Sequence, residues 1–226
     1  MANYHPSDEL LMSFSAGQMP NALGIIVACH LEKCSHCRQR AALYERIGGE
    51  ILMDTDDAPM PTQLLDNLLS KLELPEISAT NESHAISVLD SFADSERQMI
   101  QNLPRPLRRF VGNEFNKLPW TGMTSSLKEF VLSFSDNDYT AKFYKISAGK
   151  ELPEHTHRGN EYTLVLDGSF SDKAGEYHQG DFILADKRTI HQPKAANDCD
   201  CICFAVTDAP LKMTGLFGRM LNPFLK

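Results

Sequence analysis

Residues 149–168 read GKELPEHTHRGNEYTLVLDG and bring two histidines and a glutamate close together in the chain. If this stretch is extended, His155 and His157 lie on the same side of the strand, because side chains alternate with a period of two. Glu161 can return to them from the next turn or strand. A second stretch, GDFILADKRTIH, ends at His191. Three imidazoles and one carboxylate form a ligand set that suits zinc, iron, manganese or nickel.

The surrounding sequence has the pattern of short β strands. From about residue 127 onward, short runs rich in Val, Ile, Phe, Tyr and Leu alternate with turn sequences. The runs are EFVLSFS, YTAKFYKIS, EYTLVLDG, DFILA and CICFAV. Short strands at regular spacing predict a sandwich or a barrel.

This half of the chain resembles the cupin family in both of that family's motifs. The first motif fits throughout, and the second keeps its leading Gly180 and its metal-binding His191. The departures are Asp186, Arg188 and Ala195, where many cupins have Pro, Gly and Asn. The resemblance covers about residues 110–207 and implies a double-stranded β-helix barrel. The metal ligands that it implies are His155, His157, Glu161 and His191.

The N-terminal part has the spacing and the caps of helices. Ser7 can cap a first helix that Gly17 ends, and Pro20 opens a second. A third runs through HCRQRAALYERI until Gly48 and Gly49 break it. These residues predict three short helices in succession.

A fourth helix is predicted where Pro61 starts TQLLDNLLSKLEL. Its leucines repeat at intervals that place them on one helical face. They are Leu64, Leu65, Leu68, Leu69 and Leu72. Four short helices predict a small helical domain with a modest core, so this face is available for internal packing or for a partner.

Near the end of the second predicted helix, HLEKCSHC sets His30, Cys34 and Cys37 four and three residues apart. On a continuous helix these side chains fall within an arc of about 60°, so they converge. Structural zinc needs a fourth Cys or His, and His5 is the best candidate because a helical hairpin can return the chain start to this place. The alternatives for that ligand are His36 and Cys29. Competing interpretations are small core cysteines and a redox CxxC, although the βαβ context of a redox motif is missing.

The succession of His5, His30, Cys34 and Cys37 is similar to the zinc-binding motif of anti-sigma factors. This resemblance implies that the four residues hold zinc and that the helical domain masks an extracytoplasmic-function sigma factor. Followed by a cupin, the motif resembles the ChrR family of anti-sigma factors over nearly the whole chain. The family implies a 1:1 complex, released when singlet oxygen or organic hydroperoxide appears. It also implies two zinc sites and no catalytic residues, and the leucine face is then expected to bind the partner.

The alternative function is a cupin metalloenzyme of the dioxygenase or isomerase type with an accessory zinc domain. Iron or manganese with open coordination positions in the barrel would favour catalysis, whereas closed zinc sites would favour regulation. Such an enzyme does not need the helical zinc domain, and the only evident arginines for anchoring a substrate are Arg158 and Arg188. A metal store or a zinc-dependent scaffold is a third possibility.

Charge excludes some partners. The chain has 226 residues and a formal net charge of −8, and no block of Lys and Arg forms a phosphate-binding stripe. Direct nucleic-acid binding is therefore not expected. The stretch 50–100 is strongly acidic, either as a solvated linker or as a surface that attracts a basic partner. No apolar run reaches the length of a membrane span and no signal peptide opens the chain, which predicts a cytoplasmic protein.

These patterns divide the chain into a helical zinc-binding domain (1–80), an acidic linker (81–108) and a cupin domain with a C-terminal tail (109–226). Three cysteines near the end alternate with other residues and share one face if they are extended; they are Cys199, Cys201 and Cys203. Neighbours on one face of a regular strand are too far apart for an unstrained disulfide. The sequence leaves open whether they are buried small residues or an oxidant-sensing patch.

Overall fold

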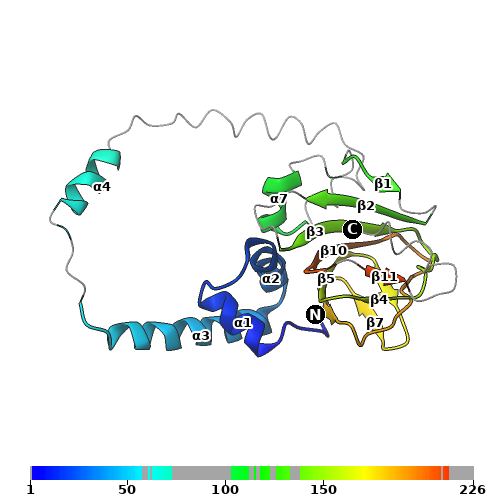
Figure 1. Cartoon of the computed structure of the whole chain (residues 1–226), viewed down its shortest axis with the longest axis horizontal. Coiled ribbons are helices and arrows are strands. Elements are labelled where there is room, and N and C mark those ends of the chain that lie inside the picture. Colours follow the sequence, from blue (N-terminus) through cyan, green and yellow to red (C-terminus); the bar gives the residue numbers. More distant parts are fainter. Residues whose placement is uncertain are drawn as a thin grey trace.

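The computed structural model describes residues 2–57, 61, 63–72, 103–111, 115, 118–122, 126–132, 138–209 and 211–213. A small helical region packs against an antiparallel β domain (Figure 1). This is the succession that the sequence predicts. Most of the predicted acidic linker and the tail beyond residue 213 lie outside the described residues.

The helices begin and end largely where local signals place them. They are α1 (Asp8–Ser15), α2 (Asn21–Lys33), α3 (Ser35–Met53), α4 (Leu64–Leu72) and α7 (Arg105–Val111). Ser7 Oγ accepts a hydrogen bond from Leu10 N at 3.4 Å and so caps α1, and Gly17 follows that helix with a φ of 66°. The predicted break at Gly48 and Gly49 is wrong, because α3 continues through both. Glycine lowers helix stability by roughly 1 kcal/mol but still makes the helical hydrogen bonds.

The structure differs from the predicted four-helix domain in the position of α4. Helices α1, α2 and α3 pack on one another, whereas α4 lies apart from them (Figure 1). Four of its leucines are exposed, with exposed fractions of 41% for Leu64, 62% for Leu65, 52% for Leu68 and 50% for Leu69. The side chain of Leu72 lies outside the described residues. The leucine face of α4 is therefore not part of the core that the structure describes.

The β domain contains three sheets with antiparallel pairing throughout. Its strands are β1 (Thr121–Gly122), β2 (Leu127–Leu132), β3 (Thr140–Ile146), β4 (His155–His157), β5 (Glu161–Asp167), β6 (Ser169–Ser171), β7 (Glu176–His178), β8 (Phe182–Ala185), β9 (Lys194–Ala195), β10 (Cys201–Thr207) and β11 (Leu211–Met213). The main sheet has the order β1-β2-β3-β10-β5-β8, and the smaller sheets are β7-β6-β9 and β11-β4.

Strand β10 is buried on both faces because its sequence alternates between two sets of apolar residues. Cys201 and Cys203 belong to the core between the main sheet and β6, β7 and β9. Ile202, Phe204 and Val206 belong to the core on the opposite face of the main sheet. A strand covered on both sides reads as a continuous apolar run, as CICFAV does.

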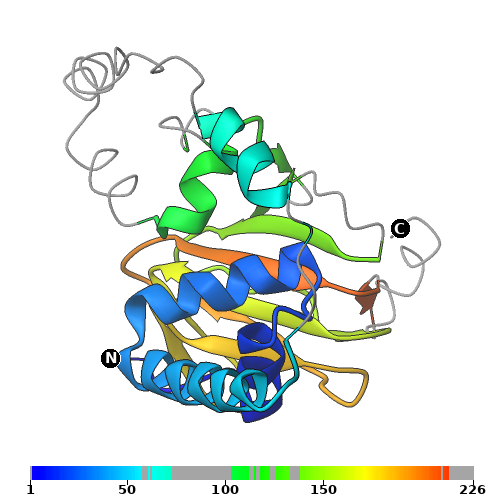
Figure 2. The same ribbon diagram turned by 90° about the vertical axis from the view of Figure 1, so that its left-hand side faces the viewer.

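Helix α2 covers that second face. It packs on β5 and β10 and lies across the main sheet (Figure 2). Ile26 and Val27 of α2 are fully buried in the same core as Phe143 and Phe204 of the sheet. The helical region and the β domain therefore share one hydrophobic core.

Helix α7 crosses the predicted boundary between linker and cupin domain at residue 108. Leu107 is fully buried in the shared core, and Arg105 N donates a hydrogen bond to Glu32 Oε2 at 2.7 Å. The chain that enters the β domain is therefore fixed on α2 before the first strand. In the part of the chain that the structure describes, no helix is both long and apolar enough to cross a membrane.

Candidate metal centres

The N-terminal cluster collects side chains from three neighbouring segments. His5 precedes α1, His30 lies in the last turn of α2, and Cys37 lies in the first turn of α3. Cys34 separates the two helices with an extended backbone, and its Sγ accepts a hydrogen bond from Cys37 N at 3.5 Å. The continuous helix considered for this stretch is therefore absent, and a helix break aims Cys34 and Cys37 toward the end of α2.

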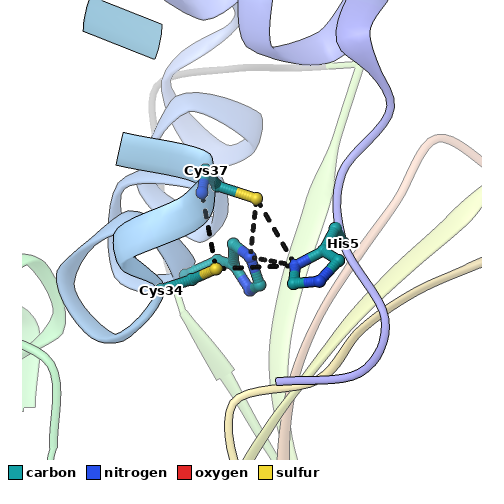
Figure 3. Close-up of side chains that lie close together, drawn as sticks. His5, Cys34 and Cys37 are labelled. Carbon is teal, nitrogen blue, oxygen red and sulfur yellow. Dashed lines mark hydrogen bonds between the residues drawn. The ribbon is translucent and has the colours of Figure 1, made fainter. Parts of the chain in front are cut away.

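The structure brings together the four residues that the sequence indicated. Their ligand atoms all lie within 4.8 Å of one another. His5 Nδ1 lies 3.4 Å from Cys37 Sγ and 3.5 Å from Cys34 Sγ (Figure 3), and His30 Nε2 lies 3.3 Å from Cys37 Sγ. Two sulfurs and two ring nitrogens in this arrangement could hold a metal ion. The alternatives for the fourth position, Cys29 and His36, lie outside this set.

Burial sets the protonation states in the N-terminal cluster. His30 is fully buried, and burial lowers its pKa to about 4, so that its ring is neutral at pH 7. Its Nδ1 donates to the carbonyl oxygen of Gly180 at 2.9 Å, which leaves the Nε2 lone pair for the cluster. Burial and the neighbouring Cys34 sulfur raise the pKa of Cys37 to about 12. A thiolate at Cys37 therefore needs a cation beside it.

A second cluster lies in the β domain. His155 and His157 are both buried on β4, and His191 pairs with His155 through backbone hydrogen bonds of 3.0 and 3.1 Å. The Nε2 atom of His191 lies 3.0 Å from that of His155 and 3.2 Å from that of His157. All three rings thus point one nitrogen at a common place. The alternation of side chains along the strand from His155 to His157 predicts this for the first two.

Hydrogen bonds on the outer side of two rings orient them. His155 Nδ1 donates to the carbonyl oxygen of Pro153 at 2.8 Å, and His191 Nδ1 donates to Asp172 Oδ2 at 3.2 Å. Burial lowers the pKa of His155 to about 4 and that of His157 to about 3, so these rings are neutral. Neutral imidazoles whose second nitrogen is hydrogen-bonded to a carbonyl or a carboxylate are typical metal ligands.

Glu161 lies beside the three histidines but not within their set. It is buried on β5 and lines the same pocket as His155 and His191. Its Oε1 accepts a hydrogen bond from the Thr163 hydroxyl at 3.2 Å, whereas Oε2 has no hydrogen-bond partner among the described residues. Burial raises the pKa of Glu161 to about 7. An unpaired buried carboxylate oxygen next to three neutral imidazoles fits a cation at this place.

The pocket that opens onto this cluster is mostly apolar. Its lining includes Leu127, Tyr144, Ile146, Leu152, Phe170, Ile183 and Cys203. Cys201 and Cys203 are free and buried on one face of β10, as predicted, with their sulfurs 3.7 Å apart. The register of β10 against β5 shifts between Ile202 and Cys203. Cys199 is exposed and precedes the strand.

Sequence reasoning missed the residues that support both clusters. Asp172 holds His191, and Asp181 accepts hydrogen bonds from the segment that carries His5. Neither acid belongs to a recognisable spacing, because the partner of each is distant in the sequence. The one sequence signal concerns Asp181, which follows Gly180 at the start of the second cupin motif. In the structure Gly180 has a φ of 94°.

Comparison with known proteins agrees with these features. Residues 109–210 match the family described as the ChrR Cupin-like domain. The chain is 30% identical to the Anti-sigma-E factor ChrR of Cereibacter sphaeroides over 223 residues, which cover 99% of this chain and 98% of that protein. It is also similar to the crystal structure of Rhodobacter sphaeroides SigE in complex with the anti-sigma ChrR. That match has a TM-score of 0.76 and 29% identity, and it covers 92% of this chain and 100% of the other.

The cupin match covers residues 109–210, whereas the 30% identity extends along almost the whole of both chains and so includes the helical region as well as the β domain. The chain belongs to the ChrR family of anti-sigma factors.

Proposed function

We propose that this protein binds an extracytoplasmic-function sigma factor in a 1:1 complex and keeps it from transcription. The observation that carries the proposal is the cluster of His5, His30, Cys34 and Cys37, whose donor atoms lie within 4.8 Å of one another. A protein similar to this chain over nearly its whole length is an anti-sigma factor, and one similar structure is a complex of such a factor with SigE. Membership of this family identifies a regulator and not an enzyme.

Zinc is the metal that we propose for the N-terminal cluster. Two cysteines and two histidines form a common structural zinc set. Zinc would supply charge that keeps both sulfurs as thiolates and would join the segment before α1 to the junction of α2 and α3. The ligands His5, His30, Cys34 and Cys37 come from the segment before α1, the end of α2 and the start of α3. The bound metal would then hold the helical region in one shape.

We place the sigma-binding surface on α3 and α4. Both helices present apolar side chains to solvent beyond residue 46, and those on α3 are Ile47 (49% exposed), Ile51 (64%), Leu52 (69%) and Met53 (84%). The exposed leucines of α4 add Leu64, Leu65, Leu68 and Leu69. Two successive helices with unburied apolar faces are typical of segments that fold onto a partner. The neighbouring acidic residues fit the basic surface of a DNA-binding partner.

The cupin cluster is the part that we propose responds to singlet oxygen or organic hydroperoxide. His155, His157 and His191 would hold the metal, with the buried Glu161 beside them as a fourth ligand. The metal there could be zinc, iron, manganese or nickel, because imidazole and carboxylate accept each of them. The proposed place of action is the cytoplasm, where sigma factors meet RNA polymerase.

Co-elution tests the proposal directly. The full-length, zinc-loaded protein is mixed with an extracytoplasmic-function sigma factor of the same organism, and the peak is analysed for stoichiometry and metals. We expect a 1:1 complex that is lost in the double variant Cys34→Ser with Cys37→Ser and retained in Cys199→Ser, since Cys199 is exposed and outside both clusters. Absence of any complex with the wild-type protein, together with iron in the barrel, would favour the cupin metalloenzyme.

The response is tested on the preformed complex. Illumination with a photosensitiser generates singlet oxygen, and the free sigma factor is measured over time. We expect release from the wild-type protein and slower release from the double variant His155→Ala with His157→Ala. Equal release rates in the two proteins would contradict the proposed role of the cupin cluster.

A further inference from the structure

Residues of the β domain contact the N-terminal cluster without belonging to its ligand set. The turn between β7 and β8 places the carbonyl oxygen of Gly180 2.9 Å from His30 Nδ1, which donates to it. The next residue, Asp181, is fully buried, and its Oδ1 accepts hydrogen bonds from the backbone N–H groups of Asn3 at 2.5 Å and Tyr4 at 3.1 Å. One turn of the β domain therefore orients one cluster histidine and binds the segment that leads to the other.

Further contacts fix the segment that carries His5. The backbone N–H of Phe182 donates to the carbonyl oxygen of Tyr4 at 3.0 Å. The ring of Tyr4 packs on the ring of Tyr177 in β7, with 4.8 Å between centroids. His5 follows directly on Tyr4, so the position of its ring depends on these contacts with the β domain.

The segment 172–182, which runs from the β6–β7 turn through β7 to the β7–β8 turn, also contacts the cupin cluster. The Tyr177 hydroxyl donates to Asp172 Oδ1 at 3.3 Å, and His191 Nδ1 donates to Asp172 Oδ2 at 3.2 Å. The side chain of Asp172 is only 4% exposed, so these hydrogen bonds are shielded from water. A series of direct contacts thus runs from His191 through Asp172 and Tyr177 to Tyr4, next to His5.

We propose that residues 172–182 form a shared outer shell for both clusters, and that a change at the cupin cluster alters metal retention at the N-terminal one through these contacts. In this view Asp181 and Tyr177 are positioning residues for the N-terminal ligands. Hydrogen bonds outside the ligand set fix ring orientation, and their loss typically costs roughly 10–100-fold in metal affinity. The inference rests on the proposed function only for its consequence, namely that looser metal binding favours release of the sigma factor. The signal then travels by contact between the domains and does not need the chain that joins them.

The first test compares metal retention in the full-length protein loaded with cobalt(II). Sulfur-to-cobalt charge-transfer absorption reports the N-terminal cluster, because of the two clusters only this one contains cysteines. Loss of the band in Cys37→Ser verifies that assignment. A chelator is added and the decay of the band is followed. We expect decay about tenfold faster in Asp181→Ala, with partial rescue in Asp181→Asn, whose carbonyl can still accept from the backbone of residues 3 and 4. Decay at the wild-type rate in Asp181→Ala would overturn the inference.

Asp200→Ala is the matched control for this test. Asp200 also accepts a hydrogen bond from a backbone N–H of the β domain, that of Ala148 at 2.9 Å, but it does not touch the N-terminal segment. We expect this variant to keep the wild-type decay rate. Equal acceleration in Asp200→Ala and Asp181→Ala would mean that any weakening of the β domain loosens the metal, and would also overturn the inference.

The second test measures coupling between the clusters and needs no substitution of Asp181. His191→Ala is made in the wild-type protein and in Tyr177→Phe, which keeps the ring contact with Tyr4 but loses the hydroxyl that reaches Asp172. We expect His191→Ala to speed decay of the cobalt band at least threefold in the first background and to have little further effect in the second. Equal acceleration in both backgrounds would refute the route through Tyr177.

Sigma binding by the same preparations separates this inference from the proposed function. A wild-type protein that binds no sigma factor would contradict the proposed function, whereas the retention measurements would still decide whether the shell is shared. A wild-type complex combined with unchanged metal retention in Asp181→Ala would leave the proposed function in place and refute the shared shell.

Discussion

The ring of His30 and the carbonyl oxygen of Gly180 share a hydrogen bond of 2.9 Å although 150 positions separate them in the chain. One residue belongs to the helical region and the other to a turn of the β domain. The hydrogen bond determines which ring nitrogen of His30 faces the N-terminal cluster. The ligand geometry of that cluster therefore depends on how the two parts of the molecule pack.

The shared core predicts that the helical region and the β domain unfold together. Ile26 is fully buried between α2 and the main sheet, so Ile26→Ala should lower the free energy of unfolding by about 2–5 kcal/mol. Urea denaturation followed by far-ultraviolet circular dichroism and by the fluorescence of Trp120 should give coincident transitions that shift together. Leu65→Ala on α4 is the control, since this side chain is 62% exposed and the expected change is within about 0.5 kcal/mol. Separate transitions would show that the two parts are energetically independent.

The metal-free protein should lose stability as the pH falls from about 6.5 to 4. An unfolded histidine has a pKa near 6.5, whereas burial lowers the pKa of His30 and His155 to about 4 and that of His157 to about 3. Below pH 6.5 the unfolded chain therefore takes up protons that the folded chain refuses, and folding becomes less favourable. Glu161 opposes this trend, because its raised pKa of about 7 favours the folded state as the pH falls, but three histidines outweigh one carboxylate.

Thermal denaturation in a chelating buffer checks this pH dependence. We expect Tm to fall steadily between pH 6.5 and 4.5, and the fall to be shallower in His157→Gln. His36→Gln serves as the control because His36 is exposed and outside both clusters. A Tm that rises over the same range would contradict the assignment of neutral buried rings.

Metal removal should affect the two clusters differently. The N-terminal cluster has four donors within 4.8 Å, whereas the cupin cluster has three with Glu161 aside. We expect the N-terminal set to retain zinc at chelator concentrations that empty the cupin cluster, since its two cysteines and two histidines form a closed structural zinc set whose donors are already together. Metal content at increasing chelator concentration, measured for the wild-type protein and for His5→Ala, tests this. The substitution should remove the difference, and an unchanged titration would exclude His5 as a ligand.

The leucine face of α4 should contribute to sigma binding without contributing to stability. Leu65 and Leu68 are more than half exposed, so Leu65→Asp and Leu68→Asp should leave Tm nearly unchanged. Each should weaken the complex at least tenfold, because a charge is then buried in an apolar interface. Ser70→Asp adds the same charge to the same helix away from the leucines and should bind within about twofold of the wild type. Isothermal titration calorimetry with the sigma factor distinguishes these outcomes.

Local signals in the sequence predicted much of this molecule. Ser7 and Gly17 bound α1 because a cap and a left-handed residue act on their immediate neighbours. The alternation of His155 and His157 likewise predicted two rings on one side of a strand. The residues that the sequence did not reveal act over long distances. Nothing local marks Asp172 as the partner of His191, and packing of α2 on β10 depends on the whole sheet.

The errors have physical reasons of the same kind. The glycines at 48 and 49 were expected to end α3, but two weak helix formers cost less than the hydrogen bonds of a continuing helix provide. The five leucines of α4 predicted its helix correctly and left its packing open. An apolar helical face shows that its burial is favourable, but it does not show which surface buries it.

Strand β10 has no side that faces solvent, since Cys201 and Cys203 face one core, where Cys203 lines the metal pocket, and Ile202, Phe204 and Val206 face the core under α2. A one-residue insertion inside Cys201–Thr207 would exchange these two sets, forcing phenylalanine into the pocket and cysteine under the helix. Insertions or deletions should therefore be tolerated before Cys201, where Asn197, Asp198 and Cys199 form an irregular turn. Within the strand they should prevent folding.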